Sequence, residues 1–242
     1  MCYPQGMLQV GCSGFPVARA RYFRAFNAVE LQSTFYEPPS LGSLRRLREE
    51  APEDFVFTLK AWQLITHEPK SPTYRRLRHP IPQGKAHLYG AFRPTQEVLG
   101  AWQRTLEAAQ TLRVAAVLFQ SPRSFRPSEE NLNNMERFFQ GIDRPKGLLL
   151  AFEPRGWEEP VATDVCRRLG LIHCVDPLRE GYLPRGRPLY LRLHGIGGYA
   201  YKYSPQELKR LAQMLKTEEG FVFFNNTHMF EDAKALKTLL EA

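Results

Sequence analysis

The amino-acid sequence predicts an α/β fold in which eight parallel strands close into a (β/α)8, TIM-barrel-like barrel. Three observations support this prediction: short apolar segments recur eight times, amphipathic helical patterns lie between them, and 242 residues match the length of one such barrel. Alternating strands and helices favour a parallel sheet, and eight units close naturally on themselves. An open doubly wound sheet is the alternative. Because no linker or repeat divides the chain, we expect residues 1–242 to form a single domain.

The expected strands are short, apolar or β-branched, and bounded by turn residues or polar positions, as strands buried on both faces should be. They cover residues 8–12, 28–35, 55–61, 114–120, 147–153, 171–176, 189–194 and 221–226. Helical spacing of apolar residues is clearest in 95–112, in 128–142, after the Ser204–Glu207 capping box and at the C-terminus. Shorter helices are expected at 17–26, 41–50 and 160–169.

The composition is that of an ordinary globular protein, with 43% apolar and 24% charged residues. No apolar run approaches the roughly 18 residues that a membrane-spanning helix needs. The N-terminus shows no secretion signal, so we expect a cytoplasmic protein without membrane contact. The formal net charge of +8 suits a polyanionic partner, although solubility alone also explains it. No C-x-x-C pair occurs, and we expect reduced, structural cysteines at Cys2, Cys12, Cys166 and Cys174.

A long basic insertion, residues 61–94, follows the third expected strand and exceeds a usual βα loop. From Lys60 to Arg93 the chain carries seven basic residues and one acid, a net charge of +6. Basic residues interleaved with aromatic rings are typical of a surface that binds single-stranded nucleic acid. The candidates for that surface are Arg75, Arg76, Arg78, Trp62 and Tyr74. The alternative is a solvated flap whose aromatic residues pack onto the barrel.

Polar side chains gather toward the ends of the expected strands, where barrel enzymes place their chemistry. Charged groups in buried strands are costly unless they are paired or functional, so a set of them at one end favours a polar pocket. We assign catalytic roles to Lys60, Glu153, Asp176 and His194, and substrate-binding roles to Glu30, Gln120, Arg155, Arg192, Asn225 and Asn226. Carboxylates beside Lys60, Arg155 and Arg192 are expected to have lowered pKa values.

A glycine-rich loop follows the seventh expected strand. Gly195, Gly197 and Gly198 are candidates for a phosphate-binding loop, because glycines let backbone N–H groups approach an anion and barrels often bind phosphate there. A simple turn is the competing interpretation. The cofactor is left open: Glu153, Asp176 and His194 are able to ligate a divalent metal together, but the sequence contains no metal-ligand motif.

Sequence motifs along nearly the whole chain resemble the domain-of-unknown-function family 72, the YecE-like proteins. The matching motifs are V-G-C-S-G-F (10–15), V-E-L-Q-S-T-F-Y (29–36), F-V-F-T-L-K-A (55–61), L-F-Q-S-P-R-S-F (118–125), F-E-P-R-G-W (152–157), Y-L-R-L-H-G (190–195) and F-F-N-N (223–226). The resemblance implies a (β/α)8-like barrel but brings no established activity. Many members read E-x-R-H where this chain has Gly156 after Arg155, so a role of that histidine is absent or replaced here.

The residues favour an enzyme that acts on a phosphate-bearing substrate, with hydrolysis of a nucleic-acid phosphodiester as the first hypothesis. A carbohydrate or sugar-phosphate hydrolase or isomerase that uses Glu153 and Asp176 is the second hypothesis. The third is a nucleic-acid-binding protein without catalysis. The expected partner is accordingly a phosphate-bearing small molecule or a single-stranded nucleic acid.

Overall fold

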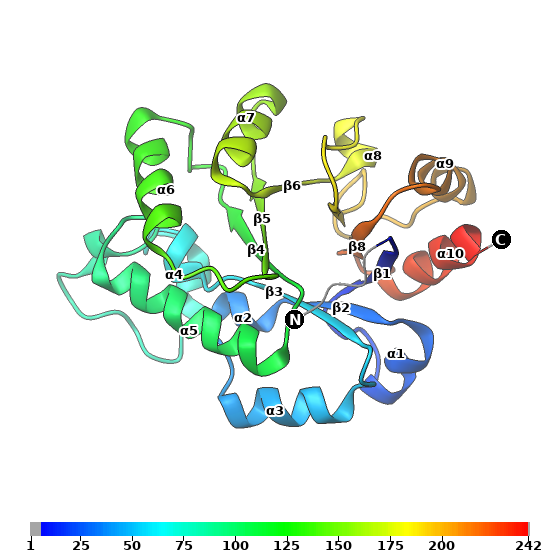
Figure 1. Ribbon diagram of the computed structural model, residues 1–242, viewed down its shortest axis with the longest axis horizontal. Coiled ribbons are helices and arrows are strands. Elements are labelled where there is room, and N and C mark those ends of the chain that lie inside the picture. Colours follow the sequence, from blue (N-terminus) through cyan, green and yellow to red (C-terminus); the bar gives the residue numbers. More distant parts are fainter. Residues whose placement is uncertain (1–5, 242) are drawn as a thin grey trace.

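Eight parallel strands form one closed barrel in the order β1 to β8, and β8 pairs with β1 (Figure 1). The computed structural model describes residues 6–241. The strands are β1 (Leu8–Ser13), β2 (Ala28–Leu31), β3 (Val56–Lys60), β4 (Ala116–Ser121), β5 (Leu149–Pro154), β6 (Ile172–Val175), β7 (Leu189–Leu193) and β8 (Gly220–Phe224). This closure confirms the barrel prediction and rules out the open doubly wound sheet.

Helices lie between the strands and surround the barrel (Figure 1). The longer ones are α1 (Arg19–Ala25), α3 (Leu41–Glu50), α5 (Gln96–Leu112), α6 (Glu129–Gly141), α7 (Glu159–Leu169), α9 (Pro205–Leu215) and α10 (Met229–Glu241). The short ones are α2 (Ser33–Tyr36), α4 (Gln63–Thr66), α8 (Pro177–Glu180) and the 3-10 turns η1 (Pro72–Arg76) and η2 (Ala86–Leu88). The capping box at Ser204 and Glu207 forms as expected.

One expected strand is too long. Residues 28–35 were expected to be extended, but β2 ends at Leu31 and the chain turns at once into α2. Gln32 already has helical dihedral angles, and the Thr34 hydroxyl donates to the carbonyl of Lys60 at 2.7 Å. The expectation was wrong because the chain turns into α2 after Leu31, where Thr34 and Phe35 are buried, instead of continuing the sheet.

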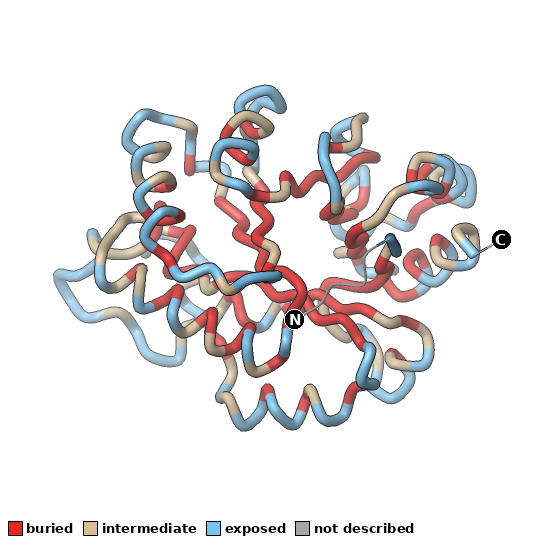
Figure 2. The backbone as a smooth tube through the Cα atoms, viewed as in Figure 1, coloured by how far each residue is buried: buried red, intermediate tan, exposed pale blue. Residues whose placement is uncertain are grey.

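The strands are buried along most of their length (Figure 2). Alternate residues of a strand point to opposite faces, so they belong to different apolar clusters. Outward residues such as Val29, Leu59 and Phe119 belong to the large core between barrel and helices. Inward residues near the N-terminal ends of the strands, including Ala28 and Phe221, form a smaller apolar cluster inside the barrel. Toward the C-terminal ends the inward positions become polar. This change in character makes that end of the barrel the candidate site.

The segment between β3 and α5 is anchored at its base. The backbone N–H groups of Gly90 and Phe92 donate to carbonyls of Leu64 and Ile65, each at 2.8 Å. Gly90 has φ +77°, and a Cβ there would lie 2.2 Å from the carbonyl oxygen of His67, so the close approach requires glycine. Phe92 is fully buried, and its ring centroid lies 5.4–5.9 Å from those of Phe119, Phe125, Phe138, Phe139 and Phe152.

Three of the four cysteines, Cys12, Cys166 and Cys174, are free and buried. Cys2 lies outside the described residues. Across residues 6–241, no helix combines the length and apolar character that crossing a membrane requires.

Candidate active site

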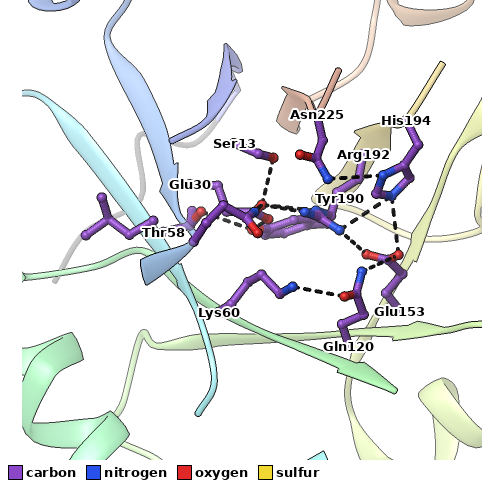
Figure 3. Close-up of polar contacts among 12 residues, drawn as sticks. Ser13, Glu30, Thr58, Lys60, Gln120, Glu153, Tyr190, Arg192, His194 and Asn225 are labelled. Carbon is purple, nitrogen blue, oxygen red and sulfur yellow. Dashed lines mark hydrogen bonds and ion pairs between the residues drawn. The ribbon is translucent and has the colours of Figure 1, made fainter. Parts of the chain in front are cut away.

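A buried arginine joins two carboxylates across the inside of the barrel (Figure 3). Arg192 on β7 donates from Nε to Glu30 Oε1 on β2 at 3.0 Å, and from Nη1 to Glu153 Oε2 on β5 at 2.5 Å. All three side chains are nearly or fully buried. Burial alone would raise the pKa of Glu153, but Arg192, His194 and Arg155 hold it well below 4.5. Glu153 is therefore ionised, in agreement with the lowered pKa expected from the sequence.

Glu30 is enclosed and does not line the pocket described below. Its Oε1 accepts a hydrogen bond from Ser13 at 2.8 Å and its Oε2 accepts one from Tyr190 at 2.7 Å, in addition to the Arg192 contact. The Tyr190 hydroxyl lies 3.0 Å from that of Thr58. With its acceptors occupied, Glu30 positions Arg192, which differs from the substrate contact that we expected from the sequence.

His194 follows β7 and has a defined contact at both ring nitrogens. Its Nε2 lies 3.3 Å from Glu153 Oε1 and its Nδ1 lies 3.2 Å from Asn225 Nδ2. In a neutral imidazole, an amide donor at Nδ1 and a carboxylate at Nε2 favour the tautomer with its proton on Nε2. In that tautomer the 3.4 Å approach of Arg192 Nη1 to Nε2 is a contact between two donors, because Nη1 donates to Glu153 instead.

A pocket of about 560 Å³ opens beside His194, and its lining comes mainly from the C-terminal ends of β5 to β8. The sequence-predicted residues that line it are Glu153, Arg155, Asp176, Arg192, His194, Asn225 and Gly198. Those that do not are Lys60, Glu30, Gln120, Asn226, Gly195 and Gly197. The lining residues missed by the sequence reasoning include Arg123, Arg179, Trp157, His173, Tyr182 and Tyr199. Arg123 and Arg179 follow β4 and β6 closely, so the strand-end rule was sufficient to find both.

Lys60 does not line the pocket and is linked to Glu153 through Gln120 (Figure 3). Its Nζ donates to Gln120 Oε1 at 2.9 Å, and Gln120 Nε2 donates to Glu153 Oε1 at 2.7 Å. The ammonium lies 4.1 Å from the centroid of the Phe35 ring on α2. Burial first, and then the charge of Arg192, lowers the pKa of Lys60 to about 7. Lys60 therefore holds Gln120, and through it Glu153, without reaching the pocket lining.

Both carboxylate oxygens of Asp176 accept hydrogen bonds from backbone N–H groups. Oδ1 accepts from Arg179 N at 3.3 Å and caps α8, while Oδ2 accepts from His194 N at 2.8 Å. Burial raises its pKa, in contrast to Glu153. Asp176 thus fixes the start of the loop that carries His194. Asn226 is directed elsewhere, because its amide donates to the carbonyl of Tyr201 and to Asp232 on α10.

The glycine-rich loop forms a turn. Gly195 N donates to the Tyr203 hydroxyl at 2.8 Å, and Gly198 N donates to the carbonyl of Gly195 at 3.1 Å. Gly195 has φ +81°, and a Cβ would lie 2.3 Å from Gly198 O. Two N–H groups that we assigned to phosphate binding are therefore used within the loop, which corresponds to the competing turn interpretation.

The residues of the predicted nucleic-acid surface differ in their exposure to solvent. Arg75, Arg76 and Arg78 are exposed. Trp62 and Tyr74 are half-buried: the Trp62 indole donates to Tyr36 O at 3.0 Å and the Tyr74 hydroxyl to His67 O at 2.7 Å. The two rings thus pack the segment onto the barrel, as the flap alternative expects. Arg75 and Arg78 are exposed to solvent, and the Arg76 guanidinium lies over the Tyr36 ring at 3.4 Å from its centroid.

Comparison with known sequences places the chain in a family. The sequence model described as "Protein of unknown function DUF72" matches residues 17–242. The chain belongs to this family. The UPF0759 protein YunF of Bacillus subtilis (strain 168) is 27% identical to this DUF72 member over 257 residues, covering 91% of this chain and 84% of YunF.

Solved structures share the fold. A DUF72 family protein from Enterococcus faecalis V583 has a TM-score of 0.71 at 18% identity, with 99% of this chain and 100% of that chain covered. SacUVDE has a TM-score of 0.59 at 11% identity, covering 92% and 83%. D-psicose 3-epimerase, solved in the presence of D-fructose, has a TM-score of 0.57 at 10% identity, covering 96% of each chain. At these identities the likeness concerns the barrel architecture alone.

The DUF72 site does not have a metal-ligand arrangement. Within the described part of the chain, no group of three or more His, Cys, Asp and Glu side chains is placed to hold a metal ion. The set that the sequence left open, Glu153, Asp176 and His194, fails because the two carboxylates are directed at Arg192 and at backbone N–H groups.

We expect acid to destabilise the folded protein through His67, which lies in the segment between β3 and α5 and is 7% exposed. Burial, then Lys60 and Arg155, lowers the pKa of His67 to about 3. The unfolded chain binds a proton near the ordinary pKa of about 6.5 and the folded chain does not, so stability falls as pH decreases from 6.5 toward 3. The slope from this group is at most about 1.4 kcal/mol per pH unit. Urea unfolding between pH 7 and 4 should show a shallower slope for His67→Gln than for the exposed control His79→Gln. Equal slopes would contradict this assignment.

Proposed function

We propose that this DUF72 protein is an enzyme that acts on a phosphate-bearing substrate in the β5–β8 pocket, with hydrolysis of a phosphodiester as its reaction. The observation that carries the proposal is the contact of 3.3 Å between His194 and the ionised Glu153 within a pocket that arginines also line. A histidine paired with a carboxylate is a common proton-transfer unit, and arginines suit the oxygens of a phosphoryl group.

In the proposed reaction, His194 Nδ1 is the atom that accepts the proton. The Glu153 carboxylate accepts a hydrogen bond from the Nε2–H of His194, which leaves the lone pair on Nδ1 as the base once a substrate replaces the Asn225 contact. Nδ1 would then take a proton from the attacking water as the water oxygen forms a P–O bond and the P–O bond to the leaving alkoxide breaks, and the Glu153 carboxylate would stabilise the resulting imidazolium. The leaving alkoxide would take its proton from solvent water, and the imidazolium would return its proton to solvent. Arg123, Arg155 and Arg179 would stabilise the negative charge that develops on the phosphoryl oxygens.

Hydrolysis of bis(p-nitrophenyl) phosphate tests the proposal. We expect the purified protein to release p-nitrophenol, and His194→Asn to lower kcat/KM by at least about 100-fold, because a positioned general base contributes that much. His228→Asn is the matched control: His228 follows β8, as His194 follows β7, but it lies outside the pocket lining, and the variant should keep full activity. Equal activity of the wild type and His194→Asn would overturn the role of His194.

A sugar phosphate is the second candidate substrate, with isomerisation as the reaction. A pocket of about 560 Å³ is large enough for one such molecule, and the same base would remove a proton from carbon. Incubation of ribulose 5-phosphate in D2O, followed by proton NMR, distinguishes the two reactions. Enzyme-dependent loss of a C–H signal would favour isomerisation, and its absence together with phosphodiester cleavage would favour hydrolysis.

Single-stranded nucleic acid is a candidate partner because Arg75, Arg76 and Arg78 are exposed. If these side chains contact phosphates, each contributes about 0.7 to the slope of log affinity against log salt, so replacing all three by alanine should reduce the slope by about 2. Fluorescence anisotropy with a labelled oligonucleotide from 50 to 300 mM salt measures this slope. An unchanged slope would show that these three arginines do not contact the phosphates of a bound nucleic acid.

A further inference from the structure

The pocket wall carries an aromatic ring that is rigidly held. Trp157 follows β5 and lines the pocket. Its indole donates to the carbonyl of Phe125 at 2.6 Å, and its ring lies stacked on Phe125, with centroids 5.9 Å and planes 19° apart. The edge-to-face contact with Phe152 has a centroid distance of 5.5 Å. Held on two sides, Trp157 offers a fixed surface to whatever occupies the pocket.

A second ring lines the pocket but is largely exposed. Tyr199 lies on the turn after β7, and 57% of the residue is accessible to solvent. Its backbone is fixed, because its carbonyl accepts a hydrogen bond from Thr227 N at 2.8 Å. Within residues 6–241, no hydrogen bond or ring contact holds the Tyr199 side chain. An aromatic ring that lines a pocket without a partner of its own is available to contact a ligand there.

Cationic side chains line the same pocket. Arg123 and Arg179 are exposed there, and across the described residues neither guanidinium forms an ion pair. Guanidinium groups bind phosphate oxygens, and an aromatic face stacks on the flat, conjugated ring of a nucleobase. His173, also in the lining, has its pKa lowered to about 4 by burial, so it adds a neutral hydrogen-bonding group at pH 7.

We propose that the substrate is a nucleotide unit whose phosphate is part of a phosphodiester, and that its base stacks on Tyr199 within the β5–β8 pocket. Trp157 forms the rigid wall of this ring-binding subsite, and the arginines bind the phosphate. This proposal rests on the proposed function, which supplies the phosphate-bearing substrate. It adds that the substrate carries a nucleobase.

Calorimetric titration with AMP, ribose 5-phosphate, adenosine and inorganic phosphate tests the subsite. We expect AMP to bind about 5- to 150-fold more tightly than ribose 5-phosphate, the range that stacking of one base provides. Tyr199→Ala should remove most of this difference and leave the affinity for ribose 5-phosphate unchanged, while Tyr199→Phe should keep it. Ile196→Ala is the matched control, because Ile196 is exposed on the same turn but is not part of the pocket lining.

The four ligands separate the two proposals. Equal affinities for AMP and ribose 5-phosphate in the wild type, or an unchanged AMP affinity in Tyr199→Ala, would overturn the base subsite. Binding of adenosine that depends on Tyr199, without binding of either phosphate ligand, would support the subsite and overturn the phosphate-bearing substrate. Binding of ribose 5-phosphate and inorganic phosphate, without a gain from adenine, would overturn the subsite alone.

Discussion

Replacing Arg192 by methionine should lower the free energy of unfolding by about 3–5 kcal/mol, because removing one partner of a buried ion pair leaves an uncompensated buried charge. Here two carboxylates lose their partner, since Arg192 bridges Glu30 and Glu153 with all three side chains buried. Water cannot replace the guanidinium beside Glu30, which is fully buried. Urea unfolding at pH 7 measures the loss.

Arg187→Met is the matched control for Arg192→Met. Arg187 precedes β7 and pairs with Glu218, but its side chain is 54% exposed. Ion pairs in such positions contribute at most about 1 kcal/mol, so the control should unfold close to the wild type. Similar midpoints for the two variants would show that Glu30 and Glu153 do not depend on Arg192 for their charge.

Replacing Phe92 by alanine should cost about 3–5 kcal/mol of stability and release the segment that follows β3. Phe92 is fully buried against five other phenylalanine rings, so its removal leaves a large cavity. Phe92 and Ala91 also have positive φ, at 52° and 51°, a strained conformation that only the surrounding contacts maintain.

Thermal unfolding and limited proteolysis together test the Phe92 anchor. We expect a lower Tm and new cleavage between residues 70 and 88. Leu77→Ala, at a half-buried position of the same segment, should cost less and leave the base of the segment protected. A Phe92→Ala protein with a wild-type Tm would show that hydrogen bonds from Gly90 and Phe92 to α4 are sufficient to hold this segment.

The arrangement of strands could be predicted because it depends on local patterns. Lys60, Glu153 and Arg192 were expected near the ends of their strands, and the structure brings them together there. The end of β2 was misjudged because a local pattern does not separate the last residues of a short strand from a short helix that follows it at once.

The sequence alone determined that a barrel would form and that its C-terminal end would be polar, since the first follows from eight apolar segments alternating with helical patterns and the second from the polar residues near the strand ends. Only the tertiary structure decided which polar residues face the pocket. Glu30 and Glu153 look equivalent as acids in apolar strands, but Ser13, Tyr190 and Arg192 enclose Glu30, whereas Glu153 lines the pocket beside His194. These contacts join residues up to 162 positions apart. Closure of the barrel creates them, and no local pattern contains that information.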